Sequence, residues 1–378
     1  MIKLIRLYNN KIQDQDNNIQ SQIKLTQLVD DDNQQSASMK NLLISSFQLG
    51  FSFLFENSQG LIILIFINQY VKNLDAIAGF GLGVVYTNCL GLSLYFGLST
   101  GFEILASHAY GAKKYQLVGL LLNKCFFIAF IMFIPICFCM IFSKYILHIW
   151  NKNEMLCEYS RQYCITQIPG IIFLATYFIF KGYLNAQNEY RSQFYISAMN
   201  YPFIFLYSYI FIGVLDLGVY GAAITFNLSR FQNLILLFIF IKRKPSLQRC
   251  QTSFSRQAFL NNWDFLKTVI PIGAIVSADW VIYEVQSGIA SNLKQSQYAA
   301  HLSLSNFNTS FFCFALGYSI GSSTYVGNEM GQKKHKISQI IWNLWYVYYF
   351  WPHSNYMASF GIFKKIICFN ANQLSRCQ

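Results

Sequence analysis

The chain has 378 residues, of which 54% are hydrophobic, 18% aromatic and 12% charged. Soluble domains typically carry about 25% charged residues, so this composition excludes an ordinary soluble domain and indicates a protein that lies in a lipid bilayer. The formal net charge of +12 could suit a nucleic-acid-binding protein, but the placement of the basic residues, described below, excludes nucleic acid as a partner.

The first 40 residues are rich in Gln, Asn and Asp and predict a disordered tail. Beyond them come long apolar runs, and a hydrocarbon core about 30 Å thick needs roughly 20 apolar residues per helix. We therefore predict membrane spans at 42–68, 77–101, 120–147, 165–184, 193–214, 219–241, 266–290 and 297–326. A ninth apolar run at 338–363 is a doubtful span, because the polar and helix-breaking residues 352–355 interrupt it.

A segment in the second predicted span recurs in the eighth. Residues 95–114 match residues 315–334 at one constant offset (331 − 111 = 220). The matching residues are Gly97, Ser99, Gly101, Gly111, Lys113 and Lys114, paired with Gly317, Ser319, Gly321, Gly331, Lys333 and Lys334. Such a repeat predicts a membrane protein built from two similar halves.

The expected fold is therefore an all-α, polytopic membrane helix bundle with two pseudo-symmetric lobes. We expect residues 1–40 to form a cytoplasmic tail, 41–242 a six-helix first lobe and 243–265 a basic cytoplasmic linker. Residues 266–336 would form a partial second lobe, followed by the doubtful ninth span and tail at 337–378.

The basic residues fall mainly on one side when the predicted loops are numbered alternately. That side receives, among others, Lys3, Arg6, Lys113, Lys114, Lys181, Lys242, Arg243, Lys244, Lys333 and Lys334. The loops of the other side carry Lys72, Lys144, Lys152, Arg161 and Lys294. Basic loops stay in the cytoplasm, so this asymmetry places the N-terminus and the 243–265 linker there.

Several motifs occur in the same order as in a known transporter family. They are the run Asn88–Lys113 in the second span, Ile168-Pro-Gly170, Leu184-Asn-Ala-Gln187, the run Leu217–Ala223, Trp263 with Leu266, Ile270 and Pro271, and the run Val326–Gly331. In this order they resemble the motifs of multidrug and toxin extrusion (MATE) transporters of the eukaryotic type, over residues 42–336. Members of that family have twelve spans in two six-helix lobes, whereas this chain offers six plus two or three.

The resemblance implies a monomeric, multi-pass protein of the plasma or a vacuolar membrane. It would export an organic cation in exchange for a coupling ion, a proton or sodium, with no cofactor and no metal. A non-transporting truncated remnant, or a mispredicted gene fragment of such a transporter, is the main alternative. A lipid-linked sugar flippase would need several cavity Arg or Lys residues, and only Arg230 and Lys181 lie near spans. The histidines are too scattered for a membrane enzyme.

Ionisable residues inside spans are rare and usually mark substrate or ion paths. Asp279-Trp-Val-Ile-Tyr-Glu284 resembles the Glu-Trp-Trp-x-Tyr-Glu of the seventh helix in eukaryotic members, whose carboxylates bind cations and couple protons. At about 100° per residue, Asp279 shares a helix face with Tyr283, while Glu284 points roughly 140° away toward a neighbouring helix. We expect Asp279 to be the coupling carboxylate, with Trp280 and Tyr283 offering aromatic faces to a cation.

Other polar residues in spans are weaker candidates. Glu56 could be a cation site or a local contact with its polar neighbours in sequence. His301, whose imidazole could change charge near neutral pH, could couple protons or simply be a packed histidine. Asn88 and Gln187 could line the first lobe or make routine interhelical hydrogen bonds. Placement at the membrane interface explains Glu103 and His108, at the end of the second span.

Overall fold

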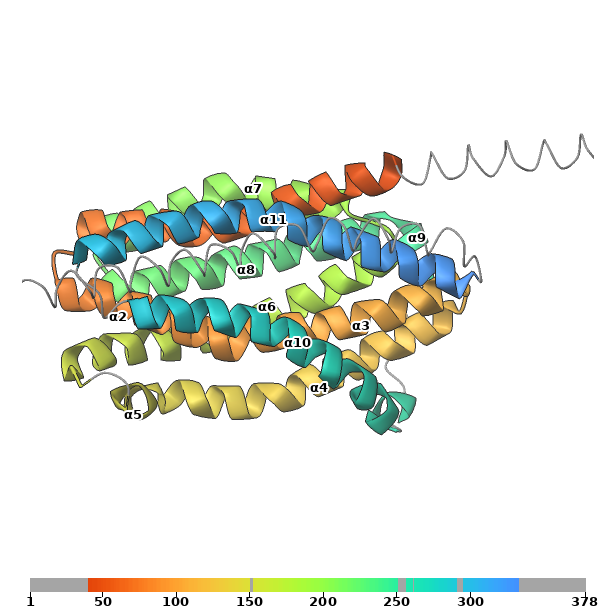
Figure 1. Ribbon diagram of the computed structural model, residues 1–378, viewed down its shortest axis with the longest axis horizontal. Coiled ribbons are helices and arrows are strands. Elements are labelled where there is room, and N and C mark those ends of the chain that lie inside the picture. The colour runs from red at the N-terminus through yellow and green to blue at the C-terminus, as the bar shows by residue number, and fades with distance from the viewer. Residues whose placement is uncertain (1–39, 150–151, 251–255, 261, 291–294, 333–378) are drawn as a thin grey trace, which may run out of the picture. The chain divides into compact units, whose positions relative to one another are not determined.

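The computed structural model describes residues 40–149, 152–250, 256–260, 262–290 and 295–332. The chain divides into two compact units, Met1–Ile44 and Ser45–Gln378, and the contacts between helices described below lie within the second. Its regular elements are helices that run alongside one another (Figure 1). The doubtful ninth span and all but the last residue of the predicted tail lie outside the described residues.

The helices follow the predicted order of spans. The first helix is Lys40–Tyr70. It is followed by α2 (Leu74–Thr87), the π-helical segment η1 (Asn88–Leu92), α3 (Ser93–Gly111), α4 (Tyr115–Ile141), α5 (Ser143–His148) and α6 (Glu154–Ala186). Then come α7 (Arg191–Ser208), the π-helical segment η2 (Tyr209–Val214), α8 (Gly218–Arg243), α9 (Pro245–Gln248), the 3-10 turn η3 (Arg256–Phe259), α10 (Asn262–Ala290) and α11 (Gln295–Gly331).

Asparagine caps set where two of these helices begin. The Asn73 side chain accepts a hydrogen bond from the backbone N–H of Asp75 at 2.9 Å, and the Asn153 side chain accepts from Met155 and Leu156 at 3.1 and 3.3 Å. A capping side chain satisfies backbone N–H groups that the first turn leaves unpaired. The cap at Asn153 explains why α6 starts at Glu154, eleven residues (165 − 154) before the predicted span.

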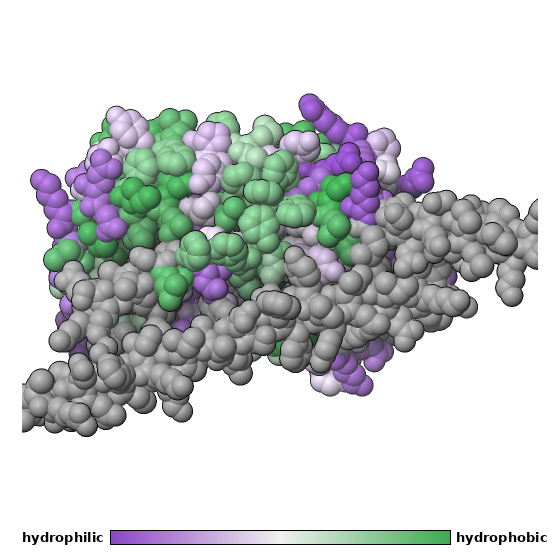
Figure 2. Space-filling view, turned by 45° about the horizontal axis from the view of Figure 1, so that its top comes forward, coloured by the Kyte–Doolittle hydropathy of each residue, from purple (hydrophilic) through white to green (hydrophobic). Residues whose placement is uncertain are grey.

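Apolar side chains cover the outside of the bundle. On α4, Phe130, Ile134 and Phe138 are 62–67% exposed, which would be unfavourable in water but suits contact with lipid. Seven helices among the described residues are long and apolar enough to cross a membrane. Figure 2 shows hydrophobic side chains over the middle of one face and hydrophilic ones toward its ends. The protein is therefore an integral, multi-pass membrane protein.

The eighth predicted span has a different character from the other seven. It is helical, as α11, and 37 residues long, but it is not among the helices that qualify by apolarity. Its first half is rich in Ser, Asn and Gln, which lowers its hydropathy. Such a helix is stabilised in a membrane by contacts with its neighbours, and α11 packs against α3, α6, α10 and the first helix.

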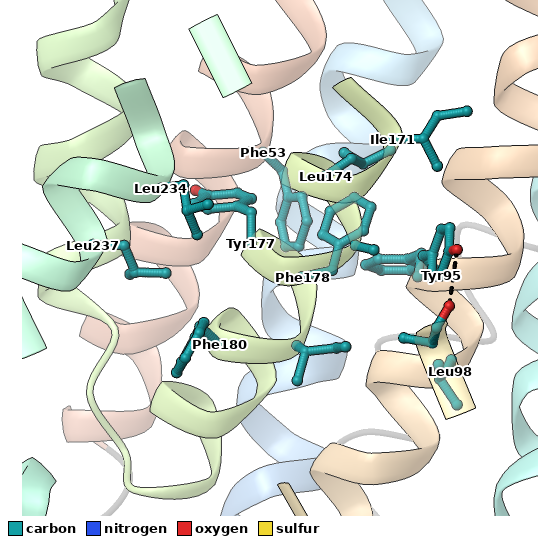
Figure 3. Packing of buried hydrophobic residues seen from close by; sticks show 14 of the residues in the cluster. Phe53, Tyr95, Leu98, Ile171, Leu174, Tyr177, Phe178, Phe180, Leu234 and Leu237 are labelled. Carbon is teal, nitrogen blue, oxygen red and sulfur yellow. Dashed lines mark hydrogen bonds between the residues drawn. The ribbon is translucent and has the colours of Figure 1, made fainter. Parts of the chain in front are cut away.

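The first half of the chain, from the first helix to the end of α8 at Arg243, is organised around α6, which contacts α2, α3, α4 and α8. Large aromatic side chains fill the space between these helices, and Figure 3 shows Phe53, Tyr95, Tyr177 and Phe178 among them. The buried Tyr95 hydroxyl donates to the carbonyl of Ala129 at 3.1 Å, so its polar end is satisfied. The core of the first half therefore specifies the positions of α3 and α6, which carry polar groups described below.

Glycines allow α10 and α11 to pack closely against α3. A Cβ at Gly97 would lie 2.5 Å from the carbonyl oxygen of Gly273, and one at Gly101 would lie 2.7 Å from Val269. Gly97 lies next to Gly273 and Gly101 lies next to Val269. Because the residue numbers rise in one helix as they fall in the other, α10 runs antiparallel to α3. Close backbone approach of this kind is typical of membrane helix interfaces with small residues.

The contacts of α11 repeat those of the first half. Gly317 lies against the backbone of Gly50 in the first helix, as Gly97 lies against Gly273 in α10. Since Gly97 and Gly317 are repeat mates, the first helix and α10 play equivalent parts. This exchange of partners is what a pseudo-two-fold relationship between the two halves requires.

The described part of the predicted linker, 243–265, packs against the first half. Leu247 of α9 and the following Cys250 are buried. The Tyr183 hydroxyl donates to the Leu247 carbonyl, and Lys244 forms an ion pair with Glu189. The linker is therefore attached to the C-terminal ends of α6 and α8 through specific contacts.

Candidate functional site

The π-helical segment η1 brings the first half to the acidic helix α10. Asn88, the first residue of η1, donates a hydrogen bond from Nδ2 to Oε1 of Glu284 at 2.8 Å. Segments of π-helix change the direction of side chains and are frequent at functional sites. Glu284 thus points toward a neighbouring helix, as the helical geometry predicts, and its partner Asn88 comes from the other half of the chain.

Aromatic rings surround the same part of α10. Trp280 packs edge-on against Phe96 of α3 and Phe312 of α11, with ring centroids 5.9 and 6.4 Å apart. Tyr283 contacts Phe312 as well, at 5.8 Å. Asp279, Trp280, Tyr283 and Glu284 are all partly buried. The acidic segment therefore lies among aromatic side chains of three helices, in surroundings that suit an organic cation.

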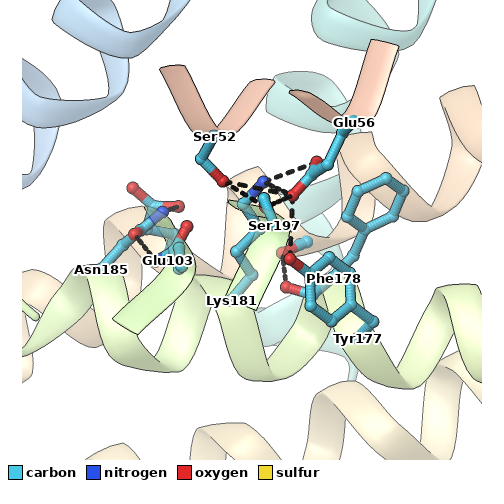
Figure 4. Close-up of polar contacts among 10 residues, drawn as sticks. Ser52, Glu56, Glu103, Tyr177, Phe178, Lys181, Asn185 and Ser197 are labelled. Carbon is cyan, nitrogen blue, oxygen red and sulfur yellow. Dashed lines mark hydrogen bonds and ion pairs between the residues drawn. The ribbon is translucent and has the colours of Figure 1, made fainter. Parts of the chain in front are cut away.

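A second carboxylate cluster lies inside the first half (Figure 4). Glu56 of the first helix forms an ion pair with Lys181 of α6, whose Nζ lies 2.9 Å from both carboxylate oxygens. The Tyr177 hydroxyl donates to Oε1 at 2.8 Å, and the hydroxyls of Ser197 and Ser52 donate at 3.2 and 3.3 Å. Glu56 therefore contacts α6 and α7, and Asn57, Ser58 and Gln59 are not the partners of its carboxylate.

The position of Lys181 corrects a prediction. The loop count assigned Lys181 to the cytoplasmic side, but it lies in α6 and is 3% exposed. Its ammonium group also lies 3.9 Å from the centre of the Phe53 ring. The loop count treats Lys181, near the end of the predicted span 165–184, as a loop residue, whereas the ion pair with Glu56 allows a lysine to remain inside the helix bundle.

Glu56 and Asp279 occupy equivalent places in the two halves. Glu56 lies six residues after Gly50 (56 − 50), the glycine that packs on Gly317. Asp279 lies six residues after Gly273 (279 − 273), the glycine that packs on Gly97. Each half therefore carries one carboxylate at the same distance along its helix from the crossing point.

A third buried carboxylate, Glu103 of α3, joins the two halves. Its oxygens accept hydrogen bonds from Asn185 of α6 at 2.9 Å and from the Thr324 hydroxyl of α11 at 2.8 Å. Glu103 is 5% exposed, so it is buried between these helices. His108, in the same helix, is exposed, and its placement at the membrane interface stays a prediction. Glu103 could not be separated from His108 by sequence because its partners lie 82 and 221 residues away.

Two further predicted site residues are Gln187 and His301. Gln187 ends α6, and its amide Nε2 donates to the Tyr183 carbonyl of the same helix at 3.3 Å. His301 lies in α11, but its side chain falls outside the described part of the structure. Of the predicted residues, Asn88, Trp280 and Glu284 are therefore brought to the contact between the first half and α10.

Comparison with known proteins agrees with this architecture. The MatE family model matches residues 49–210. The chain is 24% identical over 258 residues to Protein DETOXIFICATION 16 of Arabidopsis thaliana, covering 68% of this chain and 53% of the relative. It is 26% identical over 259 residues to Multidrug and toxin extrusion protein 1 of Homo sapiens, covering 68% and 45%. The chain thus spans about half the length of these curated relatives.

A solved structure shares the fold. The crystal structure of the eukaryotic MATE transporter AtDTX14 superposes with a TM-score of 0.72 at 19% identity, covering 82% of this chain and 68% of that one. The helix order, the family model and the curated plant and vertebrate relatives all agree with the resemblance found in the motifs. The chain therefore resembles MATE transporters in sequence and shares their fold.

Proposed function

We propose that this protein exports organic cations in exchange for protons, with Asp279 as the carboxylate that binds the proton and the cation in turn. The observation that carries the proposal is the acidic segment of α10, placed among Phe96, Trp280 and Phe312 in the contact region of the two halves. The curated relatives that are named for multidrug and toxin extrusion support a transport function.

The chemistry of exchange follows from charge in a poorly solvated site. An ionised carboxylate there is costly without a positive partner, and either a proton or an organic cation can neutralise it. The two therefore compete for Asp279. Binding of a proton from the outside releases the cation, and loss of that proton on the cytoplasmic side allows the next cation to bind.

The aromatic side chains suit the same ligand. The faces of Trp280 and Tyr283 can attract a positive charge, and their apolar area can contact the hydrophobic part of an organic cation. Glu284, which accepts a hydrogen bond from Asn88, would hold α10 against the π-helical segment and act as a second acidic group. Movement of the two halves about the linker would alternate access to the site.

The proposal is tested with the full chain in liposomes, using a fluorescent, ethidium-like cation as the substrate. A proton gradient should drive accumulation of the dye, and a sodium gradient of equal size should not. Protein-free liposomes and a proton ionophore are the controls. Accumulation driven by sodium alone would replace the proton as the coupling ion, and the absence of transport under both gradients would contradict the proposed function.

A further inference from the structure

The Glu56 cluster has the composition of a binding site for a primary ammonium ion. Such a ligand needs a negative partner, hydrogen-bond acceptors and aromatic faces. Glu56 supplies two oxygens at 2.9 Å from the ammonium nitrogen. The ring of Phe53 lies 3.9 Å from it and that of Tyr177 lies 5.7 Å away. The ammonium ion held in this site is the side chain of Lys181.

We propose that Lys181 is a built-in cation that fills the carboxylate site of the first half and closes it to protons and external cations. The inference rests on the proposed exchange of cations for protons, and it assigns that exchange to α10. Glu56 and Asp279 are equivalent by their positions after Gly50 and Gly273. Without the ammonium group of Lys181, these two equivalent carboxylates would offer two binding sites for protons and cations.

The other contacts of Glu56 fit a carboxylate that stays ionised. The hydroxyls of Tyr177, Ser197 and Ser52 all donate to Oε1, and an ionised carboxylate accepts several such bonds at once. The Ser52 and Ser197 hydroxyls also lie 2.9 Å apart. Three hydroxyls of the protein therefore donate to Oε1, and Lys181 supplies the positive charge.

The charged and titratable groups near the pair come from three helices besides the first. Tyr177 and Lys181 approach from α6, and Cys313 of α11 lies close enough to interact electrostatically with both members of the pair. Glu103 of α3 is a second carboxylate close enough to interact electrostatically with Lys181. From α7 the contacting group is the neutral Ser197. The side chain of Lys181 is 4% exposed and that of Glu56 is 18% exposed. In such surroundings, removal of the lysine would leave an unpaired negative charge.

The direct test is to vacate the site and supply the missing ammonium group from solution. Lys181→Ala removes the Cγ, Cδ, Cε and Nζ atoms, which correspond to n-propylammonium. We expect the unfolding temperature of the purified full chain to fall in this variant. Millimolar n-propylammonium, at constant ionic strength, should then raise it by several degrees. Tetramethylammonium, which has no N–H donor, should have no such effect.

The matched control is the double variant Glu56→Gln/Lys181→Ala, in which the vacated space remains but the negative charge does not. We expect n-propylammonium to leave the unfolding temperatures of this variant and of the wild-type protein unchanged. Equal shifts in the single and double variants, or no shift in the single variant, would overturn the proposal. So would a shift of the same size in the wild type, because its site should already be full.

A measurement on the wild type covers the case in which Lys181→Ala does not fold. Dicyclohexylcarbodiimide modifies protonated carboxyl groups in membranes, and mass spectrometry locates the adduct. We expect Glu56 to remain unmodified in the folded protein from pH 5 to 8 and to react once the protein is unfolded. Modification of Glu56 in the folded wild type would overturn the proposal. Neither measurement depends on transport, so its outcome can be separated from that of the proposed function.

Discussion

Gly111 of α3 lies against the backbone of Asn328 in α11, and its repeat mate Gly331 lies against His108, the repeat mate of Asn328. Because 331 − 111 and 328 − 108 are both 220, the contact is reciprocal, as at a two-fold axis. The sequence repeat and the packing of the two halves therefore have the same cause. Small residues at these positions allow two equivalent helices to meet side by side.

Gly111→Ala should destabilise the protein, because the new Cβ would collide with backbone that cannot turn away. Overpacking of this kind costs about 1–3 kcal/mol, and the unfolding temperature in detergent should fall accordingly. Gly81→Ala in α2 is the matched control, since a Cβ there meets nothing within 4 Å. It should be neutral or slightly stabilising. Equal effects of the two substitutions would contradict the close approach of α3 and α11.

The hydrogen bond between Glu103 and Thr324 should link α3 to α11. Thr324→Val keeps the shape of the side chain but removes the donor, which should cost about 1–3 kcal/mol because the carboxylate is buried. Thr309→Val, whose hydroxyl donates to the Ser305 carbonyl of the same helix at 2.8 Å, should cost less. In a double-mutant cycle with Glu103→Gln, the coupling energy measured by unfolding should be at least about 0.5 kcal/mol. Full additivity would contradict the contact.

Glu284→Gln separates the charge of this residue from its hydrogen bond. The amide oxygen of Gln can still accept from Asn88, so the fold should be kept and dye export should fall less than tenfold. Asn88→Leu removes the donor instead and should weaken export together with the unfolding temperature. Both variants are compared at matched membrane levels in the liposome assay. Complete loss of export by Glu284→Gln, with normal stability, would move the coupling role to Glu284.

The topology can be tested from both sides of the membrane. Protease sites inserted next to Lys152 and next to Pro245 are exposed to protease added to intact cells or to inside-out vesicles. The positive-inside distribution predicts cleavage near Pro245 from the cytoplasmic side alone, and cleavage near Lys152 from the opposite side alone. Cleavage near Pro245 in intact cells would reverse the assigned orientation.

The sequence predicted the helices and their relationship better than the polar contacts. Apolar runs fixed the spans because a bilayer demands them, and the repeat of Gly97 in Gly317 indicated where helices cross. The helical period also placed Glu284 toward a neighbouring helix, where the structure shows Asn88. These features depend on local periodicity or on matches within one chain, which sequence displays directly.

The partners of buried charges could not be predicted in the same way. Lys181 stands in an apolar stretch, and that alone marks it as unusual, but Glu56 lies 125 residues away. Glu103 likewise needs Asn185 and Thr324, which come from two other helices. Interhelical pairs of this kind depend on the rotation and depth of each helix in the bundle. The local sequence pattern determines neither of these.

The role of Asp279 is the central claim, and Asp279→Asn tests it most directly. The substitution keeps the size and hydrogen-bonding ability of the side chain but removes its titratable charge. A loss of about 3 kcal/mol of cation binding, at about 1.4 kcal/mol per tenfold, corresponds to a roughly 100-fold drop in transport. The measurement is pH-gradient-driven dye export by full-length protein in liposomes, with equal amounts of folded wild type and variant. We predict a decrease of about 100-fold or more, and undiminished export driven by the pH gradient would contradict the account.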